Sequence, residues 1–375
     1  MKPIIKFKLV CLLSLALLAC KSNTGSYQEN MMKYAEYITV SSADNEYSVS
    51  IANPWKKSTI LHSYTLSNKR KTSYNYATLQ NTIHTPLERV VVMTNSHCRL
   101  LVELGLEDKI AGICELEYIA DSTINNRCRE GIITDCGSAL HPNIEMIIEL
   151  NPDAILVSPF EDTGYGQLEK LGIPLIECAD YMETSPLGRS EWSRFYGRLF
   201  NAEQVADSFF LAVEEKYNDL CTFVNENINS RPTVMLDTKG GSAWYVAGGN
   251  STIGRIIEDA GGKYLFSEYK NSGSIPLSFE TVFEKAHDAD IWLLKNSTTH
   301  DQTYESIVKE FASYSQFKPY KTKNIWVCDV YQVPYFENAS FHPENLLEEY
   351  ISILHPELLT DYRQRWYHPM REAGE

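Results

Sequence analysis

The sequence predicts an α/β protein built from two lobes with parallel sheets, joined by a single long α-helix and preceded by a small N-terminal β-rich segment. Residues 89–200 and 229–375 each alternate short apolar runs with amphipathic stretches, which is the pattern of repeated β-α-β units. Between them, residues 201–228 keep a helical apolar spacing and contain neither glycine nor proline. We therefore expect a first lobe, a linker helix and a second lobe, in that order.

The segment before the first lobe, residues 34–88, has the pattern of β-structure. Its apolar residues alternate with polar ones or form short runs, and pairs such as Asn53-Pro54 separate these stretches. We expect a small antiparallel hairpin or meander that packs on the following lobe, with strands at 37–40, 47–51 and 59–64.

The first lobe opens with Val90 to Met93, a continuous apolar run typical of a buried parallel strand. The remaining elements that we expect are strands at 109–113, 154–158 and 174–176, and helices at 100–104, 143–150 and 167–171.

The linker helix is expected to begin at Asn201, with Gln204 at the capping-box position, and to form a rod of roughly 35 Å. The α/β pattern then resumes after Pro232. In the second lobe we expect strands at 234–236, 243–247, 291–294 and 324–327, and helices at 253–260, 279–286 and 346–354.

The first twenty residues carry the features of a lipoprotein signal. Lys2, Lys6 and Lys8 precede an apolar run that is too short to span a bilayer, and the run ends at Ala19-Cys20. We expect a signal peptide over 1–19, acylation of Cys20, a polar tether over 20–33 and a periplasmic protein held to a membrane by its lipid. An ordinary signal peptide or an N-terminal anchor helix is the alternative.

Composition narrows the function classes. The net charge of −15 argues against nucleic acid and other polyanions as partners. Besides Cys11 and Cys20 there are seven cysteines, and none forms a C-x-x-C motif, so neither a zinc site nor a redox motif is expected. We expect buried structural thiols, with one disulfide among Cys114, Cys128 and Cys136 left open.

A short pattern recurs in both lobes. Glu145 and Glu280 each stand in the first turn of an expected helix, and an acidic residue precedes a buried strand about one helix later. Taken singly, each glutamate could simply complement its helix dipole, which is worth a few tenths of a kcal/mol. Their matching positions in the two lobes favour a shared role.

Several short motifs occur in a characteristic order: Leu104-Gly105 before Ile110-Ala111-Gly112, the stretch 143–153, Gly172-Ile173-Pro174, Ala260-Gly261-Gly262, and Ser278-x-Glu280 before 288–290. In these the chain resembles the periplasmic substrate-binding proteins for iron–siderophore complexes, haem and vitamin B12, over residues 89–359. The resemblance implies two Rossmann-like lobes joined by one long helix, a ligand in the cleft between them, and delivery to an ABC importer.

The resemblance also implies partners. Glu145 and Glu280 match the positions at which members of this family dock into arginine-lined pockets on the two subunits of a permease dimer, which is driven by its ATPase. The binding protein itself is expected to be a monomer. A carboxylate paired with an arginine fork gives register and association rate more than affinity.

Ligands of open α/β sheets lie at the carboxyl ends of the strands. The residues expected to line the cleft are therefore Ser96, His97, Tyr118, Ser138 and Phe160 from the first lobe, and Trp244, Tyr245, Tyr331, Tyr335, Phe336 and His342 from the second. Their aromatic character suits a large planar or hydrophobic ligand, although core packing is the alternative for any single one.

No metal site of the protein's own is expected. The sequence shows no helix-spaced histidine pair, and a surface or capping role is the default for His97, His141 and His342. We expect no cofactor, and a ligand that brings its own coordinated metal. The expected cleft loops offer few basic residues against Glu115, Glu117 and Glu337. This favours a neutral or weakly charged ligand, such as a hydroxamate-type ferric siderophore or a corrinoid, and leaves haem open.

An enzyme of the envelope is the competing class. The sequence contains no G-x-S-x-G, no P-loop and no G-x-G-x-x-G after a strand, so catalysis is not expected. A subunit that holds a partner protein instead of a small molecule is the third alternative. A deep aromatic cleft would favour ligand binding over both.

Overall fold

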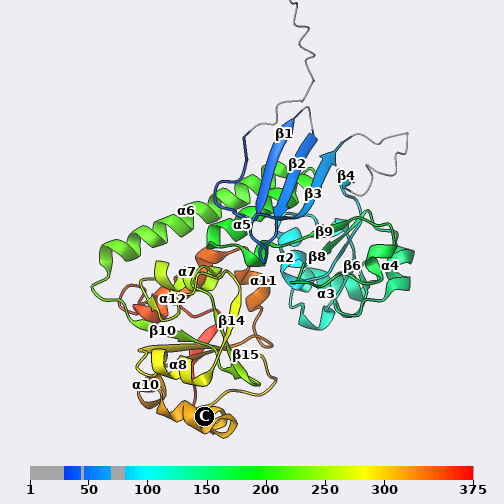
Figure 1. Cartoon of the computed structure of the whole chain (residues 1–375). Coiled ribbons are helices and arrows are strands. Elements are labelled where there is room, and N and C mark those ends of the chain that lie inside the picture. Colours follow the sequence, from blue (N-terminus) through cyan, green and yellow to red (C-terminus); the bar gives the residue numbers. More distant parts are fainter. Residues whose placement is uncertain (1–28, 44–45, 69–80, 375) are drawn as a thin grey trace, which may run out of the picture.

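Two α/β lobes lie side by side, with the long helix α6 (Glu203–Asn227) running along them (Figure 1). This computed structural model describes residues 29–43, 46–68 and 81–374. The expected signal peptide, the acylated Cys20 and the first part of the tether lie outside the described residues. Within the described part of the chain, no helix combines the length and the apolar character that crossing a membrane requires.

The N-terminal segment forms a four-stranded sheet in the order β1-β2-β3-β4. Its first three strands form the expected antiparallel meander, whereas β4 pairs in parallel with β3. In β2 the buried Val49 and Ile51 alternate with half-buried residues, so that one face of the sheet points inward. That face shares a single core with the first lobe. The strands are β1 (Ile38–Ala43), β2 (Glu46–Ala52), β3 (Ile60–Ser67) and β4 (Thr82–His84).

The sheet of the first lobe is parallel throughout, in the order β7-β6-β5-β8-β9. Strand order reverses between β5 and β8, and an open sheet of this kind binds its ligand at such a switch point. The elements are β5 (Val90–Val92), α2 (Asn95–Glu103), β6 (Ile110–Ile113), α3 (Ser122–Arg129), β7 (Thr134–Asp135), α4 (Ile144–Leu150), β8 (Ala154–Val157) and β9 (Leu175–Glu177). The helix expected at 167–171 is a single 3₁₀ turn, Leu168–Lys170.

The long helix α6 connects the lobes, as predicted, and a second helix packs beside it. Helix α5 (Pro186–Leu199) precedes α6 and packs against it. The prediction that Asn201 caps α6 is wrong, because Asn201 has a φ of 59° and lies in the left-handed turn that follows α5. Asparagine tolerates that conformation, which commonly ends a helix. The N-cap of α6 is Ala202.

The second lobe has a mixed sheet in the order β13-β10-β15-β16-β17, in which only β17 is antiparallel to its neighbour. Its strands are β10 (Thr233–Leu236), β13 (Lys263–Tyr264), β15 (Ile291–Asn296), β16 (Ile325–Asp329) and β17 (Tyr367–Pro369). The strand expected at 243–247 belongs to a separate antiparallel sheet of β11 (Lys239–Gly240), β12 (Ala243–Ala247) and β14 (Ser274–Leu277).

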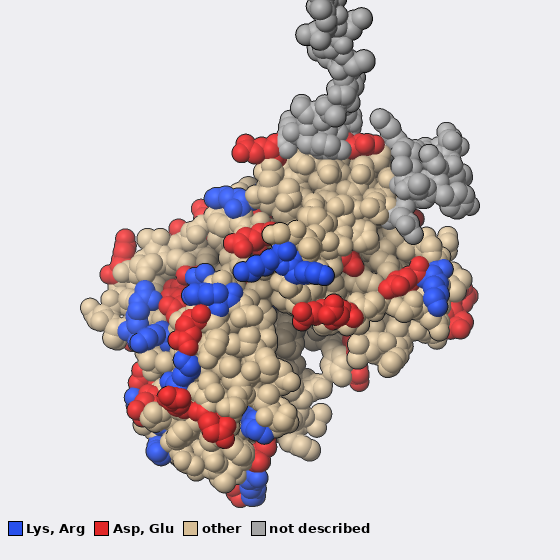
Figure 2. All heavy atoms as spheres, in the orientation of Figure 1, with Lys and Arg blue, Asp and Glu red and all other residues tan. Residues whose placement is uncertain are grey.

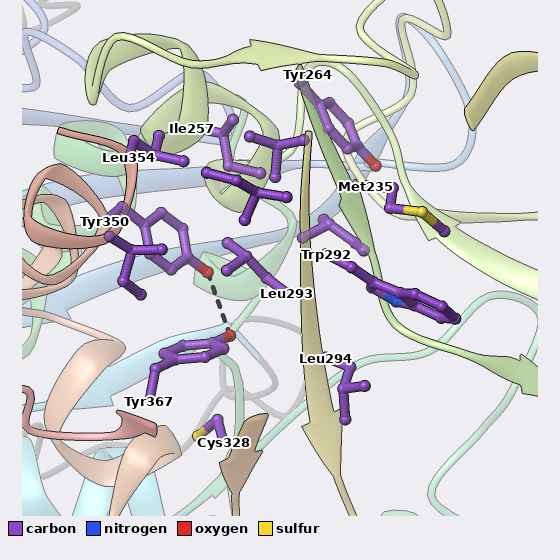
Figure 3. Close-up of a cluster of buried hydrophobic side chains, with 14 of the residues drawn as sticks. Met235, Ile257, Tyr264, Trp292, Leu293, Leu294, Cys328, Tyr350, Leu354 and Tyr367 are labelled. Atoms are coloured by element: carbon purple, nitrogen blue, oxygen red, sulfur yellow. Dashed lines mark hydrogen bonds between the residues drawn. The ribbon is translucent and has the colours of Figure 1, made fainter. Parts of the chain in front are cut away.

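Helices cover this second sheet and close its core. They are α7 (Thr252–Asp259), α8 (Phe279–Ala286), α9 (Tyr304–Glu310), α10 (Lys318–Lys321), α11 (Tyr335–Ala339) and α12 (Pro343–Leu354). In the core, Leu293 of the central strand lies among side chains from α7 and α12, and the hydroxyls of Tyr350 and Tyr367 lie 3.4 Å apart (Figure 3). The short helix α11 packs against α2 of the first lobe and so connects the lobes at the base of the cleft.

Residues 30–37, here called the N-terminal strap, lie across α5 and are held by two buried carboxylates. Glu191 accepts the backbone N–H groups of Lys33, Tyr34 and Ala35 at 2.7–3.0 Å. Glu183 accepts the N–H groups of Glu36 and Tyr37 at 2.9 and 3.0 Å, and the indole N–H of Trp192 at 2.8 Å. The strap is therefore joined to the helical connection between the lobes.

The seven cysteines in the described part of the chain are free, and five of them are buried. Burial raises the pKa of the Cys136 thiol to about 11. Such thiols are poor nucleophiles and fill the core as small apolar groups. The disulfide left open for Cys114, Cys128 and Cys136 is absent from this structure.

Candidate ligand cleft

Two adjoining cavities of about 560 and 460 Å³ lie between the lobes. They share Met93, Thr94, Asn95, Glu115 and Phe336, together with Ala139, and so form one cleft. Most of the shared residues follow the carboxyl ends of β5 and β6, next to the switch point of the first sheet. The combined space is in the range of pockets for organic ligands. Figure 2 shows the hollow between the lobes.

The wall from the first lobe contains four of its five expected residues. Ser96 and His97 open α2 and line one cavity together with Phe160, whose ring is exposed after β8. Tyr118 lines the other cavity. Ser138 does not line either cavity itself, but its hydroxyl donates to Glu115, which lines both.

His97 supports the cleft wall through a buried network. Its Nε2 lies 2.8 Å from Asp180 Oδ1 and 3.0 Å from the hydroxyl of Tyr196, and its Nδ1 lies 2.5 Å from Thr94 Oγ1. Burial alone would raise the pKa of Asp180, but His97 and then Arg189 outweigh it, and the pKa is lowered. Both ring nitrogens are engaged, so His97 is a structural residue and not a free metal ligand.

Glu115 occupies the centre of the first-lobe wall in an uncommon conformation. Its φ of 59° is left-handed, a region that non-glycine residues seldom adopt. The loop after β7 holds it there: the Glu115 N–H donates to the carbonyl of Gly137 at 2.8 Å, and its Oε1 accepts the N–H of Ala139 at 2.7 Å and the hydroxyl of Ser138 at 3.0 Å. The carboxylate is thereby fixed at the junction of the two cavities.

The wall from the second lobe comes from one segment after β16. Tyr331, Tyr335 and Phe336 line the cleft; Tyr335 is buried, whereas Tyr331 and Phe336 are about half exposed. The rings of Tyr118 and Tyr331 lie 5.7 Å apart across the two lobes. The hydrogen bond between them, followed by the charge of Glu117, raises the pKa of Tyr118 to about 12.

Besides Ser138, three residues predicted to line the cleft, all from the second lobe, do not line these cavities. Trp244 is 0% exposed and packs on Trp292, Tyr314 and Phe317 in the core of the second lobe. Tyr245, its neighbour on β12, faces outward and is exposed, away from both cavities. The two were placed wrongly because β12 belongs to the small antiparallel sheet, whose ends do not meet the cleft.

The third of these, His342, forms an ionic bridge instead. Its Nε2 lies 2.9 Å from Glu103 of α2, and its Nδ1 lies 2.9 Å from Glu344 of α12. Burial lowers its pKa, but the two carboxylates outweigh burial and raise it to about 9. A protonated His342 therefore joins the lobes, next to the ring of Phe209.

Arg189 is the main cleft residue that the sequence did not reveal. It lies on α5, donates from Nε to Asp180 at 3.2 Å and from Nη2 to Ser340 at 3.1 Å, and lines a cavity. The region of α5 carries no motif, and the contact with Ser340 spans 151 residues of sequence. No local pattern signals such a contact.

Glu145 and Glu280 occupy equivalent helix positions on the two lobes. Both are exposed in the first turn of a helix, α4 and α8, whose N-caps Asn143 and Ser278 accept N–H groups at 3.1 and 3.2 Å. The backbone N–H of Glu280 and the Ser278 hydroxyl lower the pKa of the Glu280 carboxyl. Docking through these residues stays a prediction.

The described residues contain no group of three or more histidine, cysteine or carboxylate side chains that could hold a metal ion. What the cleft offers is ring faces, hydroxyls and carboxylates. Such an arrangement can enclose an organic ligand and select it by shape and hydrogen bonding.

The sequence model of the family described as "Periplasmic binding protein" matches residues 90–331. An uncharacterized lipoprotein of Methanocaldococcus jannaschii is 29% identical over 298 residues, which are 76% of this chain and 69% of that protein. A cobalamin-binding protein of Halobacterium salinarum is 24% identical over 246 residues, 65% of this chain and 64% of that protein.

Solved structures share the fold. A protein described as an ABC-type Fe³⁺-hydroxamate transport system from Saccharomonospora viridis has a TM-score of 0.57 at 19% identity, over 72% of this chain and 94% of that one. The periplasmic vitamin B12 binding protein of Vibrio cholerae has a TM-score of 0.53 at 14% identity, over 74% and 99%. At such identities the likeness speaks for the two-lobed fold alone.

Proposed function

This chain belongs to the periplasmic binding protein family, and we propose that it captures a chelated metal complex, first of all a ferric siderophore, between its lobes and delivers it to the permease of an ATP-driven importer. Family members are substrate-binding proteins of transport systems that act outside the cytoplasm. The proposal concerns which ligand this member takes and how it is delivered.

The observation that carries the proposal is the cleft itself. It lies at the switch point of the first sheet, is walled by both lobes, and presents the rings of Tyr118, Phe160, Tyr331 and Phe336 to its interior. Aromatic rings bury a large area at little entropic cost, as recognition of a bulky organic complex requires. An organic chelator already supplies the ligands of its metal, which agrees with a cleft built from rings and hydroxyls.

Charge favours a hydroxamate complex over a catecholate one. Ferric catecholates carry several negative charges, whereas Glu115 and Glu117 line the cleft and Arg189 is engaged by Asp180. Burial of an anionic complex beside these carboxylates would be unfavourable.

A corrinoid is the second candidate. The cobalamin-binding protein of Halobacterium salinarum supports it, since it matches 65% of this chain. A corrin is large and planar with amide side chains, and amide N–H groups suit carboxylate acceptors such as Glu115. Haem is a third candidate of similar shape.

Delivery is proposed to use the two exposed glutamates on α4 and α8 as docking points on the two halves of a permease. Acylation of Cys20 would keep the protein at the membrane in which that permease lies. The name of the Methanocaldococcus jannaschii relative, a lipoprotein, supports the anchor.

The test is to identify the ligand directly. Native mass spectrometry of the protein purified from its own host should show a bound metal complex. Titration with ferric hydroxamates, ferric catecholates, haem and cyanocobalamin should then quench tyrosine and tryptophan fluorescence for one class. Quenching by cyanocobalamin alone would replace the first candidate by the second. No response to any of the four classes would refute capture of a metal chelate.

A further inference from the structure

Some of the charged residues that line the cleft form ion pairs within the wall, and others do not. Apart from tyrosines, the charged or titratable side chains among the described residues that line the two cavities are Glu115, Glu117, His97, Asp180 and Arg189. The last three bond to one another within the wall, where Asp180 accepts from both His97 and Arg189. Within this network the negative charge of Asp180 and the positive charge of Arg189 offset each other.

Arg189 is not available to a ligand anion in the way an unpaired cation would be. Its guanidinium is fixed by Asp180 on one side and by Ser340 of the other lobe on the other. Lys295 is similarly held by both oxygens of Asp237, at 2.8 and 2.9 Å, and lines only a small side cavity of about 100 Å³. The described cationic side chains near the cleft therefore already have carboxylate partners.

The carboxylates of Glu115 and Glu117 have no cationic partner of this kind among the described residues. The hydrogen bonds that Glu115 accepts come from a backbone N–H and a hydroxyl, both neutral, and both reach Oε1. Arg99 of the same lobe pairs with Glu103 and Asp121, and no ion pair to Glu115 or Glu117 is found within the described part of the chain. Glu117 is exposed beside Tyr118, whose pKa its charge helps to raise.

The rings beside these carboxylates are suited to the same kind of group. The rings of Tyr118 and Tyr331, one from each lobe, are in contact, with centroids 5.7 Å apart and planes tilted by 48°. The face of an aromatic ring attracts a cation electrostatically, and more strongly when water is excluded. Because carboxylates and ring faces lie at the same place in the cleft, both attract a positively charged group of a ligand there. On the visible face, acidic atoms border the hollow between the lobes (Figure 2).

We propose that the ligand is a cationic metal chelate, whose positive group lies between Glu115, Glu117 and the paired rings of Tyr118 and Tyr331. This inference rests on the proposed capture of a metal chelate and adds the sign of the ligand's charge. The net charge of −15 acts in the same direction, because it raises the local concentration of cations around the protein.

The experiment uses one chelate scaffold in three charge states and the full-length mature protein. Ferrioxamine B carries a pendant ammonium group, its N-acetyl derivative is neutral, and its N-succinyl derivative is anionic. Dissociation constants are measured by fluorescence quenching at low and at high salt. We expect the cationic form to bind roughly tenfold tighter than the neutral form, since a charge-assisted contact is worth about that much, and the anionic form to bind weakest.

Variants locate the effect. Glu115→Gln and Glu117→Gln should each weaken binding of the cationic form more than binding of the neutral form, and so reduce the preference for the cationic form, as expected for loss of a single ionic contact. The matched control is Glu226→Gln, an exposed residue of α6 outside the cavities, which should keep the full preference. High salt should narrow the preference in the unaltered protein.

The outcomes separate the two proposals. Equal affinity for the three forms, or tightest binding of the anionic form, would overturn the inference while capture of a chelate would stand. Aquacobalamin and cyanocobalamin, a cation and a neutral molecule on one corrin, provide the same comparison for the second candidate. If no member of either series bound, the inference would fail together with the proposed function.

Discussion

At the scale of single residues, some exposed aromatic rings line the cleft and others of similar exposure do not. Tyr331 is 48% exposed and Tyr245 is 54% exposed, but only Tyr331 lines the cleft. Exposure alone therefore does not identify the binding residues. What identifies Tyr331 as a binding residue is its position after the end of β16, where the segment turns towards the first lobe.

Replacing Tyr331 or Phe336 by alanine should weaken ligand binding by roughly tenfold or more each, the usual effect of truncating an aromatic anchor. Tyr245→Ala, which removes a ring of similar exposure outside the cleft, should leave the affinity unchanged. Fluorescence or calorimetric titration with the identified ligand measures both, and circular dichroism checks the fold. Equal affinity of Y331A, F336A and Y245A would place the ligand elsewhere.

His342 predicts a pH dependence of stability. Its pKa is raised from 6.5 to about 9 in the folded protein, because the Glu103 and Glu344 carboxylates outweigh burial. A raised histidine pKa stabilises the fold fully below about pH 6.5, and this contribution is lost as the pH rises through 9. The contribution is at most about 3 kcal/mol, from 1.36 kcal/mol per pKa unit.

The variant His342→Gln should therefore be less stable than the unaltered protein at pH 6 and nearly as stable at pH 10. Urea unfolding at pH 6, 8 and 10 measures the difference in the free energy of unfolding between the two proteins at each pH. A difference that stayed constant over that range would show that the bridge between Glu103 and Glu344 does not depend on the proton of His342.

At the scale of elements, the N-terminal strap shows how a segment without secondary structure is fixed. Glu191 is wholly buried and takes three backbone N–H groups of the strap. Glu191→Gln should lower the free energy of unfolding by about 2 kcal/mol, the range of hydrogen bonds to a charged group, and should expose the strap to proteolysis.

The control for that change is Glu214→Gln. Glu214 also binds the strap, but through the side chains of Lys33 and Tyr34 at 2.6 Å, and the strap's backbone would keep its acceptors. A loss below about 1 kcal/mol is expected for such a surface pair. Equal losses in both variants, measured by urea unfolding, would mean that the buried carboxylate has no special part in holding the strap.

Elements differed in how well the sequence predicted them, for physical reasons. The strands at 90–92, 154–157 and 291–296 were found because buried parallel strands are unbroken apolar runs. Helix α5 was not predicted, because it is buried nearly all round and has no polar face to produce a helical period. Strand β12 was found but assigned to the wrong sheet, since alternation does not specify which strands pair.

At the scale of the whole molecule, the order of lobe, linker and lobe follows from the sequence, and the family model agrees over residues 90–331. The cleft was predicted in part. Loops at strand ends were placed correctly for Phe160 and Tyr331, because the position of a parallel strand fixes its carboxyl end. Arg189 and the bridge of His342 to Glu103 depend on contacts across 151 and 239 residues, and only the folded chain brings these together.

Glu145 and Glu280 lie one on each lobe and outside the cleft, which predicts that their replacement affects transport but not ligand binding. Replacing both by alanine should leave ligand affinity intact, since neither lines the two cavities of the cleft, and should reduce uptake by roughly tenfold, because exposed charges set encounter and register. Uptake of the radiolabelled ligand by cells that depend on this protein measures the effect.

The control is Glu149→Ala, an exposed glutamate on the same helix as Glu145. It should transport normally. Unchanged uptake in the double variant E145A/E280A would return both residues to a local role as partners of their helix dipoles.

The N-terminal strap also determines which part of the fold a force on the N-terminal end of the chain acts on. Its backbone is fastened to Glu191 on α5 and to Glu183 just before it, and α5 packs on α6, the helix that joins the lobes. A force that reached residue 30 from a lipid anchor would therefore act on the packed helices α5 and α6. It would not be transmitted across the mouth of the cleft.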